Sequence, residues 1–269
     1  SEITPSFLIF FVAIFRHLVS IKLQRKRYKH FYIGFLLCIF SFLQVKATIL
    51  PIPHELKVIK RNVPTILYQH KDSAKTLINH GIAIAKKYKD DTTNALLLNQ
   101  KGIFHFLNAE YGLASSSFDS AITINEEYQV WDRLIDNLNN KGYIYRVVGN
   151  YKVALSHFQM ASKISDSLNL YHKQPITLTN LGILHRLMGN YYTAIDNFEK
   201  AARIAIKEGQ GVELANIYHN LGETYADKKE YENAIFYFDK VVQLSDNSSI
   251  PFDPTNTYSK MADVMKRQG

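Results

Sequence analysis

The sequence predicts an all-α protein that consists of stacked antiparallel helix pairs. The first observation is a repeat of forty residues, which relates the segments 140–161, 180–201 and 220–241 to one another. The second is a helical spacing of apolar residues within each repeat, interrupted by a short turn. The third is a hydrophobic content of 46% in 269 residues, which suits a folded chain. Because one helix pair cannot bury its apolar face alone, neighbouring pairs must stack.

Five columns of small and aromatic residues define the repeat. The columns are Gly102, Gly142, Gly182 and Gly222; Tyr111, Tyr151, Tyr191 and Tyr231; Ala114, Ala154, Ala194 and Ala234; Phe118, Phe158, Phe198 and Phe238; and Ala121, Ala161, Ala201 and Val241. Small residues such as Gly182 and Ala194 suit the point where two paired helices approach most closely. The phenylalanines are expected to fill the space between neighbouring units.

The third unit illustrates the two predicted helices. One face of its first helix carries Leu178, Leu181, Leu184 and His185. Residues 188–190 form the predicted turn. The second helix places Ala194, Ile195, Phe198 and Ala201 on its apolar face.

The array is expected to occupy residues 65–269, with incomplete units at both ends. Residues 48–64 contain three prolines and are interpreted as a linker, because Pro64 falls where a first helix would continue. Residues 72–88 are predicted to form a lone second helix that caps the array. Four full repeats follow over about 95–250, and residues 255–269 begin a truncated fifth.

The last segment has the apolar spacing of a first helix. Its predicted apolar face carries Tyr258, Met261, Ala262 and Met265. In the earlier units this face is covered by the helix after the turn. The pattern therefore predicts a methionine-bearing patch exposed at this end, and a continuation beyond Gly269 into a further helix.

Residues 1–47 have the layout of a secretory signal peptide. The basic segment 22–30 precedes the apolar segment 31–43, and small or apolar residues allow a cut after Ala47. Thirteen apolar residues span roughly 20 Å as a helix, short of the ~30 Å hydrocarbon core, so a retained membrane anchor is the alternative. A second apolar run at 5–15 is either a first membrane helix or part of an over-extended start.

The positive charge of the chain lies mainly in this N-terminal segment. The formal net charge is +8, and residues 1–47 hold seven Lys or Arg against one acid, a net of +6. The remainder has 25 basic and 23 acidic residues, a net of +2, which does not indicate a nucleic-acid surface. The one cysteine, Cys38, precedes the predicted cut, so disulfides are not expected.

The order of Leu-Gly, an aromatic or His three residues on, then Tyr, Ala, Phe and Ala resembles the tetratricopeptide repeat (TPR). The resemblance covers roughly 65–269 and implies a right-handed superhelix of antiparallel helix pairs, an α-solenoid. The usual TPR period is about 34 residues, and forty resembles the longer variety whose second helix runs further. The Trp common at the start of such repeats is replaced by Leu98, Leu138, Leu178 and Tyr218.

No catalytic, metal or cofactor site is predicted. His105 and His185 share a column but lie two units apart, and helices pack about 8–10 Å from each other, so they cannot share a zinc ion. The carboxylate pairs Glu126–Glu127 and Glu230–Glu232 are interpreted as solvated charge at helix ends. The sequence contains no Gly-rich phosphate loop and no nucleophile elbow.

The TPR resemblance implies a peptide-binding groove on the concave surface, which the first helices line. The residue two before the glycine often contacts bound peptide in that family, and here it is Gln100, Asn140, Asn180 and Asn220. Each carboxamide offers acceptors and donors that suit an extended backbone. Arg146 and Arg186, four after the glycine, could engage a carboxylate. A solvated polar face is the alternative interpretation.

The predicted function is an exported TPR scaffold that binds a protein or peptide and catalyses nothing itself. It resembles the sensory region of bacterial TPR-containing sensor histidine kinases, or of regulators that end in a DNA-binding domain. Their output domain would lie beyond Gly269, after a membrane span. A free-standing secreted or periplasmic scaffold is the main alternative, and a C-terminally fused enzyme such as a cyclase is a third.

Overall fold

The computed structural model describes residues 53–247 and 252–268, in which every regular element is a helix. The predicted signal segment 1–47 lies outside these residues. Within the described part, no helix is both long enough and apolar enough to cross a bilayer.

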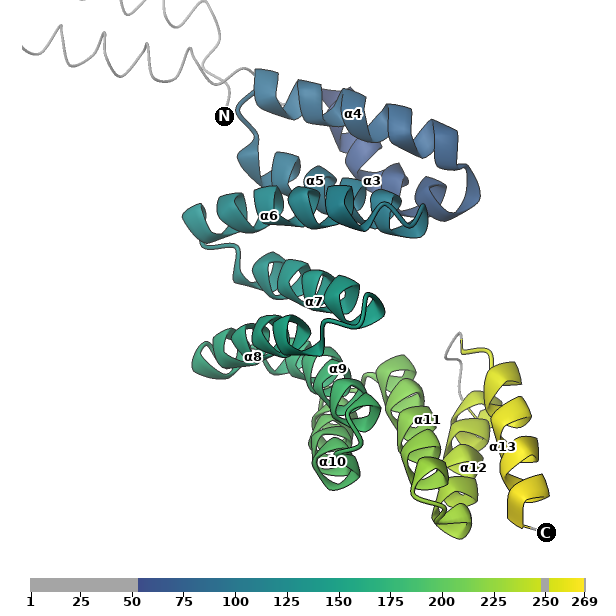
Figure 1. The fold of residues 1–269 in the computed structure, drawn as a ribbon. Helices are drawn as coiled ribbons and strands as arrows, with labels where there is room; N and C mark the ends of the chain where they lie inside the picture. The colour runs from purple at the N-terminus through teal and green to yellow at the C-terminus, as the bar shows by residue number, and fades with distance from the viewer. Residues whose placement is uncertain (1–52, 248–251, 269) are drawn as a thin grey trace, which may run out of the picture. The chain divides into compact units, whose positions relative to one another are not determined.

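The described helices follow one another with short connections (Figure 1). In chain order they are α3 (His54–Gln69), α4 (Lys71–Lys87), α5 (Asp91–Leu107), α6 (Tyr111–Glu127), α7 (Trp131–Val147), α8 (Tyr151–Ser167), the 3-10 helix η2 (Tyr171–Lys173), α9 (Gln174–Leu187), α10 (Tyr191–Lys207), α11 (Gly211–Asp227), α12 (Tyr231–Asn247) and α13 (Thr255–Gln268).

Consecutive helices pack as antiparallel neighbours, and the pairs stack in chain order (Figure 1). The strongest contacts are those within the pairs α5–α6, α7–α8, α9–α10 and α11–α12. The first helices of successive pairs, α5, α7, α9, α11 and α13, also contact each other. Their closer spacing makes them the inner layer of the stack, and the second helices form the outer layer.

The glycine and phenylalanine columns meet inside each pair. A Cβ atom built on Gly142 would lie 2.5 Å from Cε1 of Phe158, and Gly102 has the same relation to Phe118. The four column phenylalanines are at most 1% exposed. Each also reaches the next unit, as Phe158 does in a cluster with Leu181 and Leu184 of α9. The predicted core columns are therefore confirmed.

The turns recur every twenty residues with a left-handed residue at the same place. The positions with positive φ are Lys89, Ala109, Gln129, Gly149, Asn169, Gly189, Gly209 and Lys229. In the first turn of this type after α5, the Glu110 amide donates to His105 O and the Ala109 amide donates to Phe106 O. These are Schellman hydrogen bonds, which satisfy the last carbonyls of a helix.

The linker predicted at 48–64 is wrong over its described part, because α3 begins at His54 and passes through Pro64. The helix buries Leu56, Ile59, Val63 and Leu67. Each buried aliphatic side chain contributes about 1.5–3 kcal/mol, so the four outweigh an interior proline's cost of about 3 kcal/mol. The helix predicted as a lone cap is therefore α4, the second member of a pair with α3.

Helix α13 packs on α12 and α11, with Thr257 and Val264 buried. Among the predicted face residues, Met261 is partly buried, whereas Tyr258 and Met265 are 48% and 47% exposed. The buried positions Thr257 and Val264 thus each lie one residue before the predicted Tyr258 and Met265. Of the two methionines in the predicted exposed patch, Met265 is therefore exposed and Met261 is partly covered.

Candidate functional site

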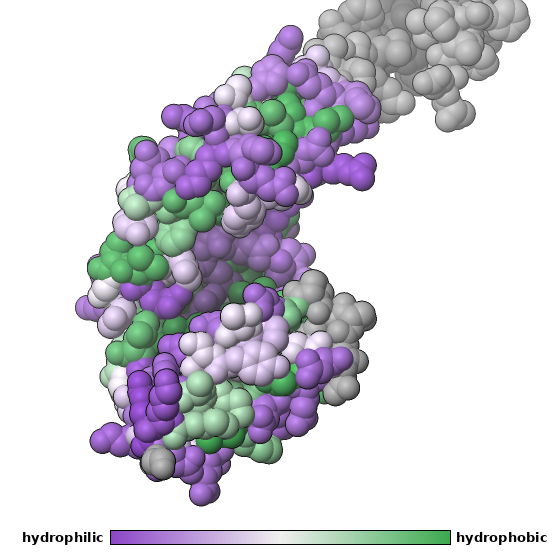
Figure 2. All heavy atoms as spheres, turned by 90° about the vertical axis from the view of Figure 1, so that its right-hand side faces the viewer, coloured by the Kyte–Doolittle hydropathy of each residue, from purple (hydrophilic) through white to green (hydrophobic). Residues whose placement is uncertain are grey.

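The inner layer of first helices carries a row of exposed apolar side chains. Leu107, Val147 and Leu187, each five residues after a column glycine, are 37%, 44% and 45% exposed. Asp227 ends this inner apolar row at α11. Figure 2 shows that the described surface is hollowed midway along the stack, and that hydrophilic side chains gather in the hollow. Exposed apolar groups beside a polar hollow are typical of a protein-binding surface.

An apolar pocket of about 280 Å³ opens at the N-terminal end of this row. Its lining includes Ile103, Phe106 and Leu107 of α5, Tyr143 of α7 and Tyr68 of α3. The rings of Phe106 and Tyr143 meet edge to face, with centroids 5.1 Å apart. This ring pair forms one wall of the pocket and joins α5 of one repeat to α7 of the next. The pocket can hold one aliphatic or aromatic side chain.

Arg146 lies beside this pocket, with its guanidinium carbon 4.5 Å from the centroid of the Tyr143 ring. It makes no ion pair with any described residue, and its buried Nε has no hydrogen-bond partner among them. Burial lowers the pKa of Arg146 from its usual value. A partly buried cation without a counter-charge is costly to maintain, so it marks a place where an anionic group would bind favourably.

Arg186 occupies the equivalent position in α9 but is already paired. Its Nη1 lies 2.7 Å from Glu223 Oε2, and Lys260 Nζ lies 3.0 Å from the other oxygen of that carboxylate. Burial opposes the ionisation of Glu223, but the charges of Arg186 and Lys260 lower its pKa overall. A ligand carboxylate would have to compete with Glu223, so the structure favours Arg146 over Arg186 as the anion site.

The predicted carboxamide row is partly engaged within the protein. Asn140 Nδ2 donates to Asn99 Oδ1 at 2.9 Å, and Asn180 Nδ2 donates to Asn139 Oδ1 at 3.3 Å. Asn220 Nδ2 donates to a carbonyl of its own helix. The three side chains keep their carboxamide oxygens without a described partner, so they can still accept a hydrogen bond from a peptide amide.

Gln100 belongs to the same row and makes no hydrogen bond with a described residue. The row therefore lies on the inner helices as predicted, but it offers mainly acceptors. The bonds between Asn140 and Asn99, and between Asn180 and Asn139, also join successive repeats.

Sequence reasoning missed Asn99 and Asn139 as the acceptors that hold this row in place. Asn99 and Asn139 are forty residues apart and directly precede Gln100 and Asn140, so the repeat itself could have identified them as a second polar column. It also missed the aromatic wall of Phe106 and Tyr143, since Phe106 interrupts the arginine column. Only the distances between helices show that these rings meet and that Arg146 adjoins them.

The two column histidines have different surroundings. His105 Nδ1 is 2.5 Å from Glu110 Oε2, whereas the buried Nδ1 of His185 has no described partner. Burial lowers the pKa of His185. Among the residues that the structure describes, no three His, Cys, Asp or Glu side chains are grouped so that they could hold a metal ion.

A family comparison agrees with this architecture. Residues 173–247 match the tetratricopeptide repeat family. That segment contains α9 to α12, and the same columns recur in the two pairs before it. The described part of the chain therefore has a TPR-like solenoid fold, and the family match itself covers α9 to α12.

Solved structures with this fold resemble the chain at low identity. BtubC from P. vanneervenii has a TM-score of 0.61 at 17% identity, over 72% of this chain and 82% of that one. A signal-transduction ATPase with a tetratricopeptide repeat sensor, from Pyrococcus horikoshii, has a TM-score of 0.64 at 17% identity, over 81% and 35%. Aspartyl phosphate phosphatase F from Bacillus subtilis has a TM-score of 0.60 at 13% identity, over 80% and 61%. A search of curated proteins found no match.

Proposed function

We propose that this TPR solenoid binds an extended peptide segment of a partner protein along its inner helices, without catalysing a reaction. The observation that carries the proposal is Arg146, a partly buried cation that has no acidic partner among the described residues and lies at the edge of an apolar pocket. A cation beside an apolar pocket matches a ligand that presents a carboxylate next to an apolar side chain.

The inner surface supplies the remaining contacts that such a ligand needs. The pocket lined by Phe106 and Tyr143 takes the apolar side chain. The free oxygens of Asn140 and Asn180 accept hydrogen bonds from the peptide backbone. The inner apolar row, Leu107, Val147 and Leu187, extends the contact along successive repeats.

A peptide-display selection against the whole chain tests the proposal. We expect the selected peptides to share an apolar residue next to Asp, Glu or a free C-terminus. Arg146→Ala should weaken their binding by about ten- to a hundredfold, since a hydrogen bond to a charged group is worth about 1.5–3 kcal/mol. Arg146→Lys should restore only part of the affinity, because lysine lacks the planar fork.

The matched control is Arg203→Ala, which removes an exposed arginine from the second helix α10. It should leave the affinity unchanged. Selected peptides without a carboxylate, or equal losses in the two alanine variants, would contradict the proposal.

The proposal also covers the location and the wider role of the protein. The basic and apolar segments before Ala47 support export to the periplasm or cell envelope, cleaved or as a membrane anchor. The TPR sensor named in the Pyrococcus horikoshii ATPase supports a sensory role in signal transduction. The histidine kinase type of output rests on the sequence resemblance alone. Recovery of the chain from the cytoplasm with residues 1–47 intact would contradict export.

A further inference from the structure

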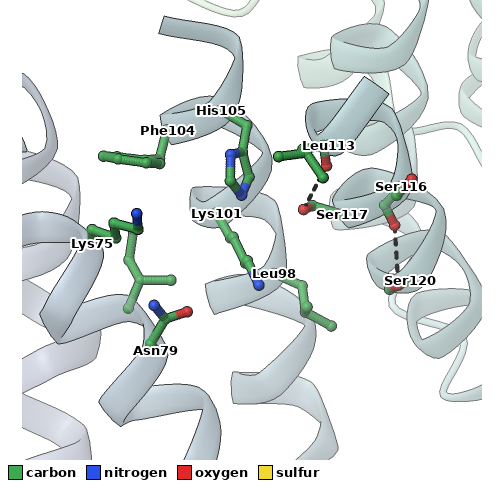
Figure 3. A pocket seen from close by; sticks show the side chains of 11 residues that line it. Lys75, Asn79, Leu98, Lys101, Phe104, His105, Leu113, Ser116, Ser117 and Ser120 are labelled. Atoms are coloured by element: carbon green, nitrogen blue, oxygen red, sulfur yellow. Dashed lines mark hydrogen bonds between the residues drawn. The ribbon is translucent and has the colours of Figure 1, made fainter. Parts of the chain in front are cut away.

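A second pocket, of about 410 Å³, lies among α4, α5 and α6 (Figure 3). Helix α4 contributes Lys75 and Asn79, α5 contributes Lys101, and α6 contributes Ser117. Figure 3 shows Lys75 and Asn79 on one side of the pocket, the serines of α6 on the other side, and Lys101 on the helix between them. The volume falls in the range of small-molecule sites, which is about 300–1,000 Å³.

The pocket exists because Ser117 stands where later pairs carry larger side chains. The equivalent residue in α8 is His157, which stacks on Tyr145 with ring centroids 5.5 Å apart. In α12 it is Tyr237, which stacks on Tyr225 at 5.5 Å. Ser117 is too short to fill this space, and its hydroxyl donates to Leu113 O at 2.8 Å.

The pocket also lacks the counter-ion that the next repeat contains. Lys141 of α7 pairs with Asp119 of α6. Forty residues earlier the same two positions hold Lys101 and Asn79, and both line the pocket. Asparagine carries no charge, and Lys101 has no ion pair with any described residue. In this repeat Lys101 therefore occupies the position of the paired lysine, but an uncharged Asn79 replaces the aspartate that would pair with it.

The rest of the lining fits an anion that has an apolar body. Lys75, the second lysine, is likewise unpaired among the described residues, and no Asp or Glu lines the pocket. Leu98 and Leu113 provide apolar walls. We propose that this pocket binds a small organic acid, whose carboxylate takes the place of the missing aspartate beside Lys101 and whose apolar body packs on the two leucines.

Titration calorimetry of the whole chain with phenylacetate tests this site, with phenylacetamide as the uncharged isostere. We expect phenylacetate to bind and phenylacetamide to bind at least about tenfold more weakly. Asn79→Asp should cut the affinity for phenylacetate by about tenfold or more, because an internal carboxylate then neutralises Lys101. Lys101→Met should have a similar effect.

Two further variants separate binding from folding. Lys152→Met, on the exposed surface of α8, should leave phenylacetate binding unchanged. Ser117→Tyr should fill the pocket as Tyr237 fills its own pair, and it should abolish binding while the melting temperature holds or rises. Equal binding of the acid and the amide, no binding at millimolar concentration, or unchanged affinity in Asn79→Asp would overturn the proposal. Binding of a glutamate-bearing peptide without binding of phenylacetate would also overturn it.

Discussion

The glycine column has no room for even one additional carbon atom next to the column phenylalanines. A Cβ at Gly142 would lie 2.5 Å from Cε1 and 2.7 Å from Cδ1 of Phe158, a ring that is fully buried. The ring cannot retreat without disturbing the next repeat, because it also packs on Leu181 and Leu184. The column is therefore glycine for reasons of space and not of backbone freedom.

Gly142→Ala should destabilise the protein by about 1–3 kcal/mol, the usual cost of overpacking a core. Gly112→Ala is the matched control, because nothing lies within 4 Å of a Cβ at that helical position. The control should hold or raise the stability, by up to about 1 kcal/mol, since alanine favours a helix. Denaturant unfolding of the two variants measures both effects. Equal changes would show that the ring does not confine Gly142.

At a left-handed turn, a glycine is expected to raise the stability of the protein rather than a substitution of glycine to lower it through overpacking. Ala109 has φ +58 at the position where Gly149 has φ +78. A left-handed residue with a side chain costs about 1–2 kcal/mol, so Ala109→Gly should stabilise the protein by about 1 kcal/mol. Gly149→Ala should destabilise it by a similar amount, and thermal melting of both variants checks the sign. A loss of stability in Ala109→Gly would contradict the turn geometry.

At the scale of the helix, the C-terminal first helices are joined by charge. Glu223 of α11 bridges Arg186 of α9 and Lys260 of α13. All three positions are on inner helices, so the bridge ties three successive units together. Arg186 and Arg146 occupy equivalent positions four residues after a column glycine. Arg186 is paired with Glu223, whereas Arg146 in α7 has no acidic partner within the described residues.

This bridge should make the stability depend on pH in the acid range. The folded-state pKa of Glu223 lies below its ordinary 4.5, so the unfolded chain takes up the proton first as the pH falls. The stabilisation is therefore present above pH 4.5 and is lost as the pH falls through the folded-state pKa. Urea unfolding of the wild type and of Glu223→Gln should give two stability curves that differ at neutral pH and converge in acid. Parallel curves would contradict the bridge.

Helix α3 shows where sequence reasoning about an element fails. Pro64 indicates a break by local chemistry, but the apolar face of Leu56, Ile59, Val63 and Leu67 has the spacing of a helix. Burial of that face against α4 and α5 decides the outcome. A local proline rule could not weigh this tertiary contact, whereas the helical spacing alone would have predicted α3.

At the scale of the whole molecule, the forty-residue period was sufficient to predict the helix pairs, their turns and their core columns. The period relates equivalent positions, and stacking forces equivalent positions to pack alike. The candidate site was less predictable because it depends on departures from the period. Phe106 in place of an arginine, Asn79 in place of an aspartate and Ser117 in place of an aromatic ring each change what a neighbouring repeat can contact.

Peptide binding along the inner helices is tested most directly by site-specific photo-crosslinking. A photoreactive amino acid is placed at Leu187 in the inner apolar row, or at Met160, which is 45% exposed on the second helix α8. With a peptide from the display selection, cross-links should form at Leu187 and not at Met160, and excess unlabelled peptide should suppress them. Cross-linking at Met160 with none at Leu187 would contradict binding along the inner face.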